Sequence, residues 1–175
     1  QGINKSDIGG LDDALQPVFS WSHALREPSL NFRLPDILCA LGVSQLQKLK
    51  NWVDKRAQLW NLYQCLLDGE DYFKLVRKED WCEPAWHLCA VQLDFEELRT
   101  SRIDVFKFLN KMGISPQVHY QPVHLQPYWI DRYGREELPN SESYFHKTMS
   151  LPLHVAMSVT DVEYVVENLI KAVRV

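Results

Sequence analysis

The longest regular pattern of apolar positions lies between Ser44 and Gly69. Ser44 and Gln47 have the spacing of a capping box, so we expect a helix that begins here and ends before Gly69. Steps of three and four place its apolar residues on one helix face, which we expect to be buried. These residues are Leu46, Leu49, Val53, Ala57, Trp60, Tyr63 and Leu67. A separate short helix is predicted from Pro35 to Gly42.

Strands and helices alternate in the rest of the chain. Residues 86–93 form a short apolar run, which is typical of a strand covered on both faces. Residues 114–120 alternate in polarity, and Pro116 restricts that strand to the edge of a sheet. Further helices are predicted to begin at Ser101, Ser141 and Ser158, with a brief extended segment at 150–153. This order predicts an α/β domain in which a small sheet packs against helices.

Composition narrows the class of protein. The chain has 175 residues, of which 46% are apolar and 24% charged, as in an ordinary globular domain. Residues 1–30 show no clear period and are interpreted as a connecting arm. The net charge of −4 argues against nucleic acid or an anionic membrane as the partner. No apolar run reaches the ~20 residues of a membrane helix, so we expect a cytoplasmic protein.

The four cysteines, at positions 39, 65, 82 and 89, show no Cys-x-x-Cys spacing. We therefore expect reduced, buried thiols rather than disulfides. Cys82, His87 and Cys89 could approach one another, but a fourth ligand is missing, and we reject a zinc site.

Three segments carry polar residues that the fold alone does not require. Residues 31–33, Asn-Phe-Arg, suit phosphate or carboxylate recognition, but they also fit a turn with a solvated arginine. Residues 117–128 present Gln, His and Tyr side chains that can hold sugar hydroxyls and a diphosphate, or form a proline-stiffened surface loop. Residues 150–154 fit a strand end with a lone histidine. No Gly-rich phosphate loop, nucleophile elbow or pair of carboxylates is found in the sequence.

The same three segments resemble a known family. Residues 31–42 read Asn-Phe-Arg-Leu-Pro-Asp-Ile-Leu-Cys-Ala-Leu-Gly, with Ser-Gln-Leu at 44–46. This resembles the N-Y-R-x-x-D-I-x-A-A-L-G-x-x-Q-L signature of the DegT/DnrJ/EryC1/StrS sugar aminotransferases. Residues 118–128 resemble the family segment V-H-Y-x-P-x-H-L-Q-P-Y, and residues 139–142 and 150–153 match P-x-A-E and S-L-P-L. The long second motif resembles most the branch that makes 4-amino-4,6-dideoxy sugars, including the pseudaminic-acid pathway transaminase.

The resemblance implies a fold-type I enzyme that depends on pyridoxal phosphate (PLP). Such enzymes transfer an amino group from glutamate to a nucleotide-linked keto-sugar in surface polysaccharide or glycan biosynthesis, and they work as homodimers. The lysine that forms the Schiff base belongs to a large domain that precedes the region of resemblance. Residues 31–175 are then the C-terminal small domain and residues 1–30 the arm from a missing N-terminal large domain. We expect this chain alone to be inactive.

The family motifs also imply roles for individual residues. Asn31 is expected to bind the PLP phosphate of the other subunit, and Arg33 to lie near the phosphates or sugar of the substrate. His119, Tyr120 and His124 are expected to line the nucleotide-sugar entrance. Two alternatives stay open: a PLP-dependent sugar dehydratase in which the lysine is replaced, and a stand-alone, non-catalytic module for nucleotide-sugar binding or dimerisation.

Overall fold

The computed structural model describes residues 3–4, 24–25, 30, 32–76 and 78–174. The chain divides into two units, residues 1–47 and residues 48–175. In the first unit, β1 (Ile3–Asn4) pairs antiparallel with β2 (Ala24–Leu25). Helix α1 (Asp36–Leu67) begins in the first unit and ends in the second.

The second unit is built on a three-stranded antiparallel sheet in the order β3-β4-β5. Its strands are β3 (Phe73–Leu75), β4 (Cys89–Leu93) and β5 (Thr148–Leu151). In the central strand β4, buried residues alternate with half-buried ones, as expected when one face of the strand meets the core. Val91 is opposite Leu75 on one side and Met149 on the other, which fixes the register at the centre of the sheet.

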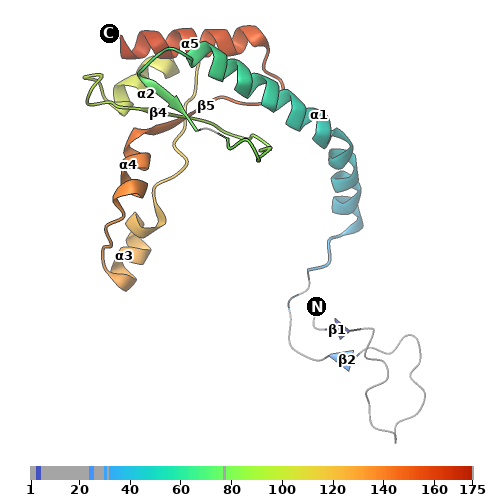
Figure 1. The fold of residues 1–175 in the computed structure, drawn as a ribbon. Coiled ribbons are helices and arrows are strands. Elements are labelled where there is room, and N and C mark those ends of the chain that lie inside the picture. Colours follow the sequence, from blue (N-terminus) through green and yellow to red (C-terminus); the bar gives the residue numbers. More distant parts are fainter. Residues whose placement is uncertain (1–2, 5–23, 26–29, 31, 77, 175) are drawn as a thin grey trace, which may run out of the picture. The chain divides into compact units, whose positions relative to one another are not determined.

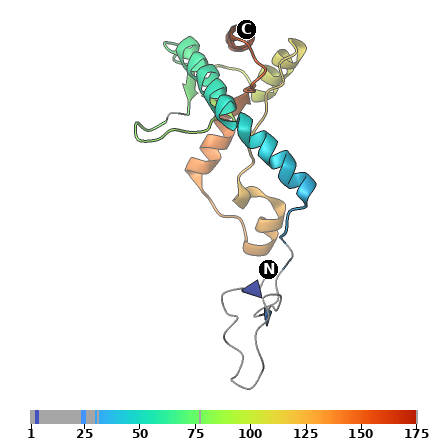
Figure 2. The same cartoon turned by 90° about the vertical axis from the view of Figure 1, so that its right-hand side faces the viewer.

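Helices surround this sheet in two groups. They are α2 (Arg102–Lys111), the 3-10 helix η1 (Val123–Leu125), α3 (Pro127–Tyr133), α4 (Pro139–Lys147) and α5 (Val159–Val173). Helices α2 and α5 lie with the C-terminal half of α1 on one side of the sheet, whereas η1, α3 and α4 extend from the other side (Figures 1 and 2). The second group contains the segment that resembles the family motif.

Capping residues set the starts of α2 and α5, as predicted. The Ser101 side chain accepts a hydrogen bond from the Asp104 amide at the start of α2. Ser158 and Asp161 form a complete capping box at the start of α5, where each side chain accepts from the other's amide. The apolar stripe of α5 is buried from Val162 to Val173, except for the half-buried Ile170. The predicted combination of helices with a small sheet is confirmed.

The core lies between the sheet and the group formed by α1, α2 and α5. Trp60 of α1 is 2% exposed and stacks on Trp86, with ring centroids 4.2 Å apart. Tyr63, one turn further along α1, donates a hydrogen bond of 2.9 Å to the Pro152 carbonyl just after β5. Burial raises the pKa of the Tyr63 hydroxyl and raises the pKa of the Cys89 thiol to about 12, so both groups stay uncharged in the core.

Two predictions about α1 are wrong. The short helix that was to end at Gly42 and the helix that was to begin at Ser44 form one continuous helix. A glycine inside a helix costs about 1 kcal/mol relative to alanine, which long flanking helical segments can offset. The helix ends instead before Gly69, whose φ is +87°. The predicted buried stripe is also only half buried, because Leu46 and Leu49 are exposed whereas Trp60, Tyr63 and Leu67 are buried in the core.

The predicted strands also need correction. Strand β4 begins at Cys89, so residues 86–88 lie outside it. Residues 114–120 are not a strand: they contribute a single antiparallel bridge between Gln117 and Ser150, at the sheet edge where Pro116 leaves no amide to donate. Strand β3 was not predicted because its three residues are too few to show a period.

The four cysteines are free. Cys89 is buried as predicted, but Cys39 and Cys65 are exposed and Cys82 is half-buried. The expectation of buried thiols is therefore wrong for Cys39 and Cys65, both of which lie on α1.

Candidate functional site

His119 is held against the edge of the sheet. Its Nδ1 lies 2.9 Å from the Oγ of Ser150, a residue of β5 that is 3% exposed. The backbone fixes the same place, because the Gln117 amide donates to the Ser150 carbonyl at 3.0 Å and the Ser150 amide donates to the Gln117 carbonyl at 2.7 Å. A buried strand residue thus sets the position of a half-buried imidazole.

Tyr120 follows directly and projects into solvent. Its side chain is 76% exposed, and its ring meets the His119 ring edge to face with centroids 4.7 Å apart. This places a phenol hydroxyl and an imidazole side by side at the surface. Together they can donate and accept hydrogen bonds to a polar ligand.

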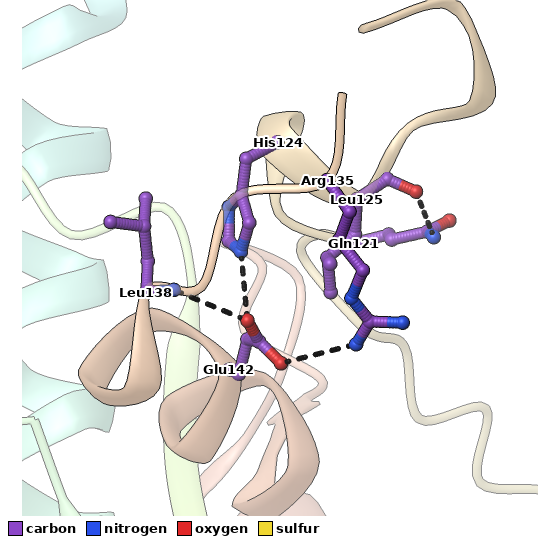
Figure 3. Close-up of polar contacts among 6 residues, drawn as sticks. All are labelled: Gln121, His124, Leu125, Arg135, Leu138 and Glu142. Carbon is purple, nitrogen blue, oxygen red and sulfur yellow. Dashed lines mark hydrogen bonds and ion pairs between the residues drawn. The ribbon is translucent and has the colours of Figure 1, made fainter. Parts of the chain in front are cut away.

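His124 lies in η1 and is tied to another helix. Its Nε2 is 3.2 Å from Oε1 of Glu142, in the first turn of α4 (Figure 3). The same carboxylate accepts a hydrogen bond of 3.3 Å from the Leu138 amide and lies 3.8 Å from the Arg135 guanidinium. The hydrogen bond from His124, followed by the one from Leu138, holds the pKa of Glu142 below its ordinary value of 4.5. Glu142 is therefore an ionised acceptor near neutral pH.

The loop that carries His124 is braced by its own side chains. The side-chain Nε2 of Gln121 donates to the backbone carbonyl of Leu125 at 3.0 Å (Figure 3). The side-chain Nε2 of Gln126 donates to the backbone carbonyl of Gln121 at 3.4 Å. These bonds close the turn around η1 without help from the sheet. The loop is therefore folded back on itself and is not an extended connection.

A pocket of about 520 Å³ opens beside His124. Its walls come from η1, α3 and the approach to α4, and they are mainly aromatic and apolar with a few polar groups. They include Val123, His124, Trp129, Tyr133, Leu138 and Ser141. Trp129 and Tyr133 stack with centroids 5.6 Å apart, and both remain partly exposed, at 40% and 70%. A pocket of this size with convergent polar groups is typical of a small-molecule site.

The predicted residues fall into two parts of the chain. His119, Tyr120 and His124 all lie on the segment between α2 and α3 of the second unit. Arg33 belongs to the first unit, where it is exposed. Asn31 lies outside the described residues, so its role remains a prediction.

Sequence reasoning missed Glu142 and Ser150 as partners of the histidines. Both residues were recognised only as parts of landmarks that resemble the family, at 139–142 and 150–153. Their contacts join segments 18 and 31 residues apart, which periodicity within one element cannot show. The aromatic helix α3 was also missed, although Pro127 at its first position is a helix-start signal.

No helix in the described parts of the chain is long and apolar enough to cross a membrane. No group of three or more His, Cys, Asp and Glu residues in those parts of the chain is arranged to hold a metal ion.

Comparison with known proteins identifies the family. Residues 13–170 match the model of the DegT/DnrJ/EryC1/StrS aminotransferase family. The chain belongs to this family. Among its members, the UDP-4-amino-4,6-dideoxy-N-acetyl-beta-L-altrosamine transaminase of Campylobacter jejuni is 30% identical over 149 residues, which are 85% of this chain and 39% of that protein. The spore coat polysaccharide biosynthesis protein SpsC of Bacillus subtilis is 30% identical over 151 residues, again 85% of this chain and 39% of the relative.

Solved structures of aminotransferases have the same fold. The Helicobacter pylori aminotransferase PseC, involved in the biosynthesis of pseudoaminic acid, matches 90% of this chain and 42% of its own, with a TM-score of 0.79 and 25% identity. Spr1654 of Streptococcus pneumoniae, in its PLP-form, matches 87% of this chain and 39% of its own, with a TM-score of 0.77 and 23% identity. The chain thus spans about two fifths of the length of the relatives that it matches.

Proposed function

We propose that this chain is the C-terminal small domain, residues 31–175 with the arm 1–30, of a PLP-dependent aminotransferase. The enzyme transfers an amino group from glutamate to a nucleotide-linked keto-sugar in the biosynthesis of a surface polysaccharide or glycan. The observation that carries the proposal is the 30% identity to a nucleotide-sugar transaminase over 85% of this chain. The segment between α2 and α3 supports it, since His119 and Tyr120 present polar groups there and His124 lines a pocket.

Two residues of the family motif, Asn31 and Arg33, have side chains that suit the phosphate of the cofactor or substrate. Arg33 is an exposed cation and Asn31 a neutral amide donor, and both can bind phosphate without acting as competing nucleophiles. Asn31 would hold the PLP phosphate of the other subunit of a homodimer, and Arg33 would lie near the phosphates of the substrate. PLP supplies the electron sink that makes amino transfer possible. We place the Schiff-base lysine in the large domain, outside these 175 residues.

The residues of this chain act by binding and orientation. His119 is held by Ser150 through Nδ1, so Nε2 is the ring nitrogen that can bind a ligand. Tyr120 adds a hydroxyl beside it, and His124 forms part of the wall of the pocket of about 520 Å³. These groups suit a ligand that carries both sugar hydroxyls and a diphosphate.

The test uses the full-length protein that contains this chain and runs the reaction in reverse. UDP-4-amino-4,6-dideoxy-N-acetyl-β-L-altrosamine is the amino donor and 2-oxoglutarate the acceptor, and glutamate formation is measured. We expect glutamate to form, and we expect His119→Ala to raise the KM for the amino sugar about tenfold, as the loss of one hydrogen bond of about 1.4 kcal/mol would. The matched control is His146→Ala, an exposed histidine of α4, which should leave both KM values unchanged.

Other outcomes distinguish the competing functions. Loss of a sugar hydroxyl as water, with no amino transfer, would indicate a sugar dehydratase. Binding of UDP-sugars with no turnover of any of them would indicate a non-catalytic module. An unchanged KM for the amino sugar in the His119→Ala variant would remove His119 from the site.

A further inference from the structure

Glu142 has polar contacts with three other residues. Its carboxylate contacts the imidazole of His124 in η1, the amide of Leu138 at the start of α4, and the guanidinium of Arg135 (Figure 3). The side chains of Glu142 and His124 are only 20% and 11% exposed, so this contact is shielded from water. The Arg135 side chain is 64% exposed and 3.8 Å away, so that ion pair contributes little.

The contact determines which ring nitrogen of His124 carries a proton. An ionised carboxylate can only accept hydrogen bonds, so Nε2 must be the donor at 3.2 Å. In the neutral ring, Nδ1 is then an acceptor and the nitrogen that remains for a ligand. A hydroxyl group is the natural donor to such a nitrogen.

His124 also belongs to the wall of the pocket of about 520 Å³. Leu138 and Ser141, which flank Glu142 in sequence, line the same pocket. Holding His124 against Glu142 therefore fixes one wall of the pocket as well as the tautomer of the neutral ring.

We propose that Glu142 is a positioning residue for substrate binding: it orients His124 and keeps the proton on Nε2, so that Nδ1 accepts a hydrogen bond from a hydroxyl of the nucleotide-sugar in this pocket. The inference rests on the proposed function and goes one step beyond it, because it assigns a role to a residue that need not touch the substrate. Glu142 also accepts from the Leu138 amide, so a purely structural role at the start of α4 is the competing explanation.

A double-mutant cycle in the full-length enzyme separates the two explanations. We expect Glu142→Ala to raise the KM for the amino sugar five- to tenfold, with kcat within twofold and the KM for 2-oxoglutarate unchanged. Glu142→Gln keeps an acceptor oxygen and should restore most of the affinity. In a His124→Ala background, Glu142→Ala should raise the KM no further. Arg135→Ala is the matched control, since it removes the third partner of the carboxylate, and it should leave every constant unchanged.

An equal rise in KM in the presence and absence of His124 would overturn the proposal, because Glu142 would then act through α4 alone. If Glu142→Ala does not yield folded protein, the nitrogen shifts of the His124 ring in the wild-type protein decide the question by NMR. A neutral ring protonated on Nε2 supports the inference, whereas a proton on Nδ1 overturns it. A wild-type enzyme that forms no glutamate would refute the proposed function, and the NMR measurement would still test the contact between Glu142 and His124.

Discussion

Replacing Ser150 by alanine isolates the contact that anchors His119. The backbone bonds of Ser150 to Gln117 do not involve the side chain, so the substitution removes only the Oγ that lies 2.9 Å from Nδ1 of His119. A hydrogen bond of this kind contributes about 0.5–1.5 kcal/mol net. Because His119 is half-buried, water can replace the hydroxyl in part, and we expect a loss of about 1 kcal/mol.

The assay is urea denaturation of the 175-residue chain, followed by tryptophan fluorescence. The stacked pair of Trp60 and Trp86 reports loss of the core. Ser150→Ala, His119→Ala and the double variant form a cycle whose coupling free energy is the strength of the contact itself. We expect a coupling of about 1 kcal/mol, together with a higher KM for nucleotide-sugar in the full-length Ser150→Ala enzyme.

Ser143→Ala is the matched control, because Ser143 is an exposed serine of α4 with no role in the contact. It should leave the free energy of unfolding within about 0.5 kcal/mol of the wild type. A coupling below about 0.3 kcal/mol, the usual error of additivity, would refute the anchoring of His119 by Ser150.

Three further predictions concern the stability and self-association of the chain. Thr148→Val should stabilise the chain by about 1 kcal/mol in the same urea assay, because Oγ1 of Thr148 is buried with no partner among the described residues; a destabilised variant would contradict this. The hydrogen bond from Lys147 lowers the pKa of Asp94 from its ordinary 3.8. The wild type should therefore have a higher free energy of unfolding than Asp94→Asn above pH 3.8, and this difference should disappear as the pH falls further. A difference that grows in acid would refute the pairing. Leu41→Lys should weaken self-association in sedimentation, since Leu41 is 55% exposed, whereas Gln47→Lys on the same helix should not; equal effects would exclude an apolar contact.

The sequence predicted those parts of the fold that depend on local signals. The starts of α2 and α5 follow from Ser101 and Ser158, whose side chains act on amides three residues away. The apolar residues of α5 lie on one face because their spacing matches the period of a helix. Such signals lie within a few residues and need no knowledge of the rest of the chain.

The errors came from long-range effects. Gly42 has the local signal of a helix end, but it lies inside a 32-residue helix because the helical segments on both sides continue through it. The apolar side chains at the start of that helix have the same period as the buried ones, so the sequence cannot show that Leu46 and Leu49 stay exposed. Burial depends on which other segments pack against a helix face, and the apolar period of that helix carries no information about them.

The residues of the candidate site were also predicted only in part. His119, Tyr120 and His124 were identified through their resemblance to a family motif. The rings of His119 and Tyr120 are in contact, and His124 lines a pocket. Their partners Ser150 and Glu142 come from β5 and α4, and only the pairing of distant segments brings them into contact.

The most direct test of the central claim is the intact mass of the protein from its native source after borohydride reduction. The proposed function predicts a chain much longer than 175 residues that carries a lysine-linked pyridoxyl adduct. A native chain of about this length without an adduct would contradict it, and a binding module would take its place.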